Sequence, residues 1–129
     1  MKRINFSSGS KWEDIVGYSR AVKVGNIVEV TGTVASGEDG AVVGKDDPYE
    51  QTKYVYQKIE KVLQQAGASM KDVTRVRMFV TDISKWQEYG RAHHEFFSEI
   101  KPCNTMVEVS ALIEPAYMIE IEATAVITN

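Results

Sequence analysis

The sequence predicts a single α+β domain in which a mainly antiparallel sheet carries two helices on one face. Three observations support this fold class. Segments with β-type alternation occur early, in the middle and at the end of the chain; two segments between them have helical spacing; and no repeat or linker divides the 129 residues. The predicted order is β-β-α-β-α-β-β, and residues 1–129 are expected to form one domain.

A hairpin is the first predicted element. Two short segments rich in β-branched residues, 21–24 and 27–31, flank the dipeptide Gly25-Asn26, which favours a tight turn. Residues 34–45 are rich in glycine and acidic side chains, which is typical of a loop, and residues 41–43 are a candidate edge strand within it.

Two helices are predicted further along the chain. Asp47 can cap the first helix and Pro48 suits its first position, and apolar residues then recur at helical spacing over 48–66. The second helix is expected over 84–100. Its apolar stripe would consist of Trp86, Tyr89, His93 and Phe96 or Phe97.

The remaining strands are predicted from alternation over 73–80, 105–112 and 118–127. In the first of these, Val76, Met78 and Val80 are expected on one side and Arg75, Arg77 and Phe79 on the other. In the last two strands the odd-numbered residues are expected to face the helices. These residues are Val107, Val109, Ala111, Ile119, Ile121, Ala123, Ala125 and Ile127.

The other face of the sheet is then too apolar for simple exposure to solvent. It would mix Met106, Leu112 and Met118 with Glu108, Glu120 and Glu122. A monomer would leave this face uncovered, whereas self-association would cover it. The sequence therefore predicts an oligomer.

Composition argues against several classes of function. A formal net charge of −3 and scattered Lys and Arg residues give no attraction to a phosphate backbone, so nucleic acid is not an expected partner. No apolar run approaches the roughly 20 residues of a membrane helix, and we expect a cytoplasmic protein without a membrane partner. Cys103 is the only cysteine, and the His93-His94-Glu95 run lacks metal-ligand spacing. We expect no metal and no cofactor, and a passive thiol.

The chain resembles the RidA/YjgF family along nearly its whole length. The resemblance is carried by residues 17–19 (Gly-Tyr-Ser), residues 31–32 (Thr-Gly), a Pro-x-x-Thr-x-Val-Glu-Val strand from Pro102, and the Ile-Glu-Ile-Glu-Ala segment at 119–123. It implies a chorismate-mutase-like homotrimer with small-molecule sites in the clefts between subunits. It also implies a deaminase of imines or enamines, which is a hydrolase acting on C=N bonds.

The resemblance also implies roles for individual residues. Glu120 matches the glutamate that activates or orients the attacking water, and the backbone carbonyl of Met106 matches a contributor to the water site. Asn104 stands where the best-known branch has an arginine that grips the substrate carboxylate, which indicates a different substrate. The substrate-binding set implied by the resemblance is Tyr18, Thr31, Gly32, Asn104, Thr105 and Met106.

Simpler interpretations stay open. Glu108, Glu120 and Glu122 could pair with Arg75 and Arg77 and hold subunits together. The trimer could also be a non-catalytic metabolite-binding or chaperone-like protein. RNA cleavage, an older hypothesis for the family, fits poorly with the acidic balance of the chain.

Overall fold

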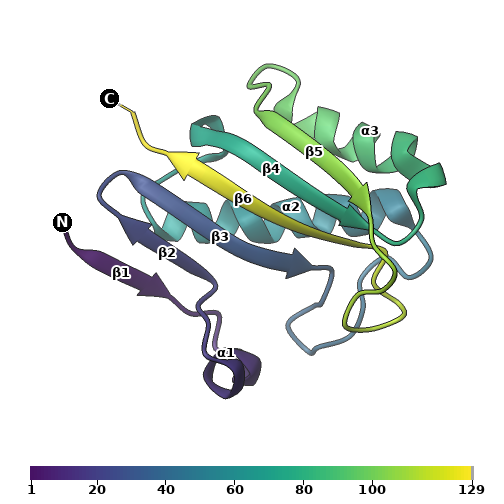
Figure 1. Cartoon of the computed structure of the whole chain (residues 1–129), viewed down its shortest axis with the longest axis horizontal. Helices are drawn as coiled ribbons and strands as arrows, with labels where there is room; N and C mark the ends of the chain where they lie inside the picture. The colour runs from purple at the N-terminus through teal and green to yellow at the C-terminus, as the bar shows by residue number, and fades with distance from the viewer. Residues whose placement is uncertain (129) are drawn as a thin grey trace.

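The computed structural model describes residues 1–128 and contains one six-stranded sheet in the order β1-β2-β3-β6-β4-β5. Two long helices cover one face of this sheet (Figure 1). The predicted α+β class is thereby confirmed. In chain order the elements are β1 (Arg3–Phe6), α1 (Lys11–Val16), β2 (Ala21–Val24), β3 (Ile27–Val34), α2 (Pro48–Gln65), η1 (Met70–Asp72), β4 (Val73–Val80), η2 (Ile83–Lys85), α3 (Trp86–Phe97), β5 (Cys103–Glu108) and β6 (Ile119–Val126).

Helix α2 begins where its predicted cap and its apolar stripe agree. Asp47 accepts a hydrogen bond from the backbone N–H of Glu50 at 3.0 Å and Pro48 occupies the first turn, as predicted. Tyr56, Ile59 and Leu63 of α2 are fully or almost fully buried against the sheet. The helix predicted over 84–100 is shorter, since a 3₁₀ turn, η2, precedes α3.

The alternation of β4 is confirmed. Val76, Met78 and Val80 are fully buried beneath the helices, whereas Arg75 and Phe79 are only partly covered on the other face. No helix among residues 1–128 is long and apolar enough to cross a bilayer.

Two N-terminal elements were not predicted. Strand β1 pairs antiparallel with β2, and α1 follows it with Ser10 as its cap and Gly17 at a φ of 93° just past its end. Both elements are short and carry weak periodicity, so pairing with β2 is needed to recognise β1. Residues 41–43 form no strand, and only an isolated bridge joins Ser36 to Val42.

The prediction for β5 was wrong in both length and orientation. The strand ends at Glu108, and it runs parallel to β4 with Met78 beside Met106 and Phe79 beside Val107. Met106 therefore packs toward the helices, while Val107 is 42% exposed on the opposite face. Both parities of this segment carry apolar residues, so alternation was ambiguous and the pairing with β4 settled it. For the same reason Glu108 does not share the face of Glu120.

Candidate active site

The outer face of the sheet, which no helix covers, is interrupted by a β-bulge in β3. Val30 pairs with Ala123 and Thr33 pairs with Ile121, so two residues of β3, Thr31 and Gly32, lie opposite a single residue of β6. Such a bulge bends its strand and changes the direction of nearby groups. Here it brings the backbone of residue 32 toward β6.

Gly32 lies directly against the carboxylate of Glu120. A Cβ atom on residue 32 would stand 2.5 Å from Oε2 of Glu120 and 3.0 Å from its Cδ. A glycine inside a strand commonly marks such a close approach. The absence of a side chain at residue 32 thus makes room for this carboxylate.

Arg20 is the cation nearest to this arrangement. Its Nη2 donates to the carbonyl oxygen of Gly32 at 2.7 Å, and its guanidinium carbon lies 6.0 Å from the centre of the Tyr18 ring. Burial lowers the pKa of Arg20, but an arginine stays protonated at neutral pH. Its Nε is buried and has no acceptor among residues 1–128.

Glu120 is half-buried, and its environment favours the protonated carboxyl more than water does. Burial raises the pKa of Glu120, the positive charge of Arg20 opposes this rise, and the negative charge of Glu122 adds to it. A carboxyl group whose pKa moves toward neutrality is suited to taking up and returning a proton.

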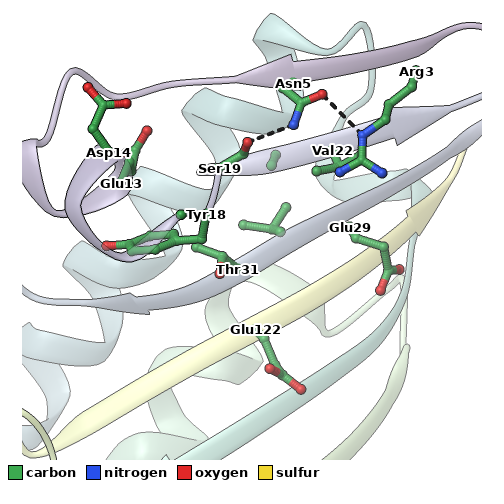
Figure 2. Close-up of a pocket in the computed structure, with 13 residues that line it drawn as sticks. Arg3, Asn5, Glu13, Asp14, Tyr18, Ser19, Val22, Glu29, Thr31 and Glu122 are labelled. Atoms are coloured by element: carbon green, nitrogen blue, oxygen red, sulfur yellow. Dashed lines mark hydrogen bonds between the residues drawn. The ribbon is translucent and has the colours of Figure 1, made fainter.

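An open hollow of about 640 Å³ adjoins this region on the outer face. Figure 2 shows Tyr18 next to Thr31, with Glu29 and Glu122 on neighbouring strands. Glu13 lines the hollow too, but its carboxylate accepts hydrogen bonds from the backbone and hydroxyl of Ser8. Burial would raise the pKa of Glu13, and these hydrogen bonds outweigh that effect and lower it. Glu13 is therefore an anion that holds α1 in place.

The residues expected from β5 lie away from this group. β5 is the edge strand, and β4 separates it from β6, so it lies roughly 10 Å from β6. Thr105 shares the outer face with Arg77, whereas Asn104 and Met106 are in register with the helix-facing Val76 and Met78. One chain thus brings together Tyr18, Thr31, Gly32 and Glu120, but not Asn104, Thr105 or Met106.

Comparison with known proteins identifies the family. The family model described as endoribonuclease L-PSP matches residues 9–127. The chain belongs to this family, which is the RidA/YjgF family. A crystal structure of a YjgF family member from Mycobacterium tuberculosis is 48% identical, with a TM-score of 0.89, and the match covers 98% of this chain and 100% of that one.

Two relatives are similar to this chain in sequence. A RutC family protein of Pyrococcus abyssi is 38% identical over 108 residues, which are 84% of each chain. The 3-aminoacrylate deaminase RutC of Acinetobacter baylyi is 35% identical over 108 residues, which are 84% of this chain and 85% of the relative. The RidA/YjgF family thus includes a protein named as a deaminase.

The structure separates the roles of the three glutamates. Glu122 forms an ion pair with Arg77 at 3.3 Å on the outer face, as the structural interpretation expected. Glu108 instead accepts a hydrogen bond from the backbone N–H of Ile83 at 3.0 Å, at the start of η2. Within residues 1–128, Glu120 has no salt bridge to Arg75 or Arg77. Glu122 and Glu120 are both half-buried near the bulge, but of the three glutamates only Glu120 has no ion pair or hydrogen bond within residues 1–128.

The other candidate groups have structural surroundings. His93 packs between α2 and α3, where its Nδ1 lies 2.6 Å from the hydroxyl of Tyr56. Cys103 is exposed at the start of β5. The described residues contain no cluster of three or more His, Cys, Asp or Glu side chains that could hold a metal ion.

Arg20 is the component of the site that the predicted set of site residues did not include. It directly follows the Gly-Tyr-Ser segment at 17–19 and precedes the buried Ala21, so strand alternation places it on the outer face. Alternation alone could have indicated the face. It could not have indicated the contact with Gly32, because that contact depends on the bulge in β3.

Proposed function

We propose that this member of the RidA/YjgF family is a hydrolase that deaminates a small imine or enamine. The observation that carries the proposal is the half-buried carboxylate of Glu120, which lies against Gly32 beside Arg20 on an open face of the sheet. The deaminase name of the Acinetobacter relative supports the same reaction class.

The proposed reaction is the addition of water to a C=N bond. Glu120 accepts a proton from water as the water oxygen bonds to the imine carbon, and the nitrogen is protonated. The resulting carbinolamine collapses to a carbonyl compound and ammonia, so the net reaction consumes one water for each ammonia released. A carboxyl group with a raised pKa can both accept and return the transferred proton.

The proposed site lies between subunits of a homotrimer. Among residues 1–128, β5 pairs only with β4, so its outer edge is free to approach the open face of another copy. A second copy would then supply Asn104, Thr105 and the carbonyl of Met106 to the group around Glu120. This arrangement would explain why one chain contains the two parts of the site on separate strands.

The proposed substrate differs from the 2-iminoacids of the arginine-bearing branch. Asn104 offers a neutral amide where a carboxylate would need a charged, two-pronged donor. The hollow near Tyr18 is lined by Glu13, Asp14, Glu29 and Glu122 and by one arginine, Arg3. This charge balance disfavours strongly anionic ligands, including RNA.

Ammonia release tests the proposal. The assay generates imines and enamines enzymatically and compares their decay with and without the purified protein. The proteins compared are wild type, Glu120→Gln and the control Glu88→Gln. Glu88 is an exposed α3 residue paired with Arg91, so its replacement should leave the rate unchanged. We expect Glu120→Gln to lose at least about a hundredfold in rate, within the range of general acid–base catalysis.

Two outcomes would reject this function. Full activity in Glu120→Gln would show that the carboxylate has no role in the reaction. Decay at the spontaneous rate with every imine tested, together with a small molecule retained in the purified trimer, would favour the non-catalytic metabolite-binding alternative.

A further inference from the structure

We infer that Arg20 is a positioning residue for Glu120, because its guanidinium holds the carbonyl of Gly32 at the β3 bulge and places a fixed positive charge beside the carboxylate. The catalytic part of this inference rests on the proposed function. The electrostatic part does not, because it concerns only groups within this chain.

The contacts connect Arg20 to Glu120 through Gly32. Arg20 Nη2 donates to the Gly32 carbonyl at 2.7 Å, and a Cβ atom on the same glycine would collide with the Glu120 carboxylate. The backbone N–H of Thr31 also donates to the carbonyl of Arg20 at 3.1 Å. Arg20 therefore contacts both residues of the bulge, and replacing its side chain would remove the contact with the Gly32 carbonyl, beside which Glu120 lies.

Lys58 is a second half-buried cation in this region, and its contacts differ from those of Arg20. Lys58 Nζ donates to the carbonyls of Val34 and Ser36 and to the Ser36 hydroxyl at 2.9–3.1 Å, so its donors are used in holding the chain after β3. Burial and the charge of Arg20 lower the pKa of Lys58 to about 8. Arg20, by contrast, keeps a buried Nε without an acceptor. Buried donors without partners are rare in folded proteins.

The charged groups around the pair are few. Glu120 is influenced by Arg20, which precedes β2, and by Glu122 on its own strand, and Glu122 is itself paired with Arg77 of β4. Arg20 is influenced by Tyr18, by Glu13 of α1 and by Glu120. Within residues 1–128, Arg20 is thus the cation whose charge acts on Glu120, and it favours the ionised carboxylate.

Carbon-detected NMR titration of the Glu120 carboxyl group tests the inference in the full-length protein, with its signal assigned by comparison with Glu120→Gln. In Arg20→Gln we expect the pKa of Glu120 to rise by about one unit, the lower end of the effect of a neighbouring opposite charge. Arg20→Lys should give a smaller rise, because charge is kept. The control Arg91→Gln removes an exposed arginine paired with Glu88 and should leave the titration unchanged.

The pH dependence of ammonia release gives the catalytic readout. In Arg20→Gln, the part of the pH–rate profile that reports the ionisation of Glu120 should move to higher pH. The shift should equal the shift in the midpoint of the NMR titration. An NMR shift without any imine hydrolysis would support the role of Arg20 and reject the proposed function. A Glu120 titration in Arg20→Gln that coincides with wild type would overturn the inference, whatever the activity.

A measurement on the wild type covers the case in which Arg20→Gln does not fold. The Nε–Hε signal of Arg20 should titrate with the same midpoint as the Glu120 carboxyl, because coupling between two charges is reciprocal. An Arg20 signal that does not respond through the Glu120 midpoint would overturn the inference without any variant.

Discussion

At the scale of single residues, Asn104 is the position where the resemblance to the best-known branch of the RidA/YjgF family implies an arginine. Its side chain is exposed on the edge strand β5 and makes no hydrogen bond among residues 1–128. Nothing in one chain therefore requires asparagine at this position for stability. Its exposure is compatible with the role in substrate selection that we propose.

We predict that wild-type protein hydrolyses 2-iminobutyrate hardly above the spontaneous rate and that Asn104→Arg gains part of this activity. A charge-assisted contact contributes about 1.5–3 kcal/mol, which corresponds to roughly ten- to a hundredfold in binding. Ammonia release from the enzymatically generated imine measures the gain. Asn104→Gln, which adds length without charge, is the matched control. Rapid hydrolysis by the wild type would show that another donor already holds the carboxylate.

At the level of elements, the contact between α2 and α3 contains a buried titratable pair. The hydroxyl of Tyr56 lies 2.6 Å from Nδ1 of His93, and the His93 ring lies 4.8 Å from that of Phe97. Burial lowers the pKa of His93 to about 4, and the neighbouring His94 adds to this effect. The neutral imidazole, with Nδ1 as acceptor, therefore fits this contact.

Stability should consequently fall when the pH drops from about 6.5 toward 4. In this window the unfolded chain binds a proton at residue 93 and the folded chain does not, so the free energy of unfolding decreases as pH decreases. The largest loss from this group is about 3 kcal/mol. Urea unfolding at pH 7 and pH 4.5 should show a smaller difference for His93→Gln than for wild type. His94→Gln, at an exposed position, removes only the smaller contribution to the lowered pKa of His93 and should keep most of the wild-type difference. Equal differences for all three proteins would contradict the prediction.

For the whole molecule, the main consequence of the fold is one sheet face covered by helices and one left open (Figure 1). The open face carries the Arg77–Glu122 ion pair and the 42% exposed Val107. Apolar side chains of α1 also stand exposed near it, with Trp12 at 55% and Ile15 at 68%. Such a mixture of charged and apolar groups is typical of a surface that associates.

We predict a homotrimer at micromolar concentration, measured as mass by light scattering. Val107→Glu should lower that mass, because it places a charge on the open face. Lys61→Glu, which changes charge at an exposed position of α2, should leave the mass unchanged. A monomeric mass for wild type would contradict both the trimer and the inter-subunit site.

Much of the fold could be predicted from local features of the chain. The capped α2 helix, the β2–β3 hairpin and the alternation of β4 depend on groups within a few residues of one another, and the structure confirms them. β1 and α1 were missed, and β5 was assigned to the wrong face. A strand of four residues, or one with apolar groups on both faces, carries too little periodic signal; its partner strand decides its orientation.

The candidate site also has one part that the sequence predicts and one part that only the folded structure determines. The resemblance to the family was enough to single out Glu120, Tyr18, Thr31 and Gly32, because these residues belong to three short segments of characteristic sequence. The contact of Arg20 with Gly32 and the burial of Glu120 arise only when the bulge in β3 meets β6 and the residue before β2 meets β3. A residue's type is a local property, whereas its pKa and its hydrogen-bond partners depend on groups that folding brings from distant parts of the chain.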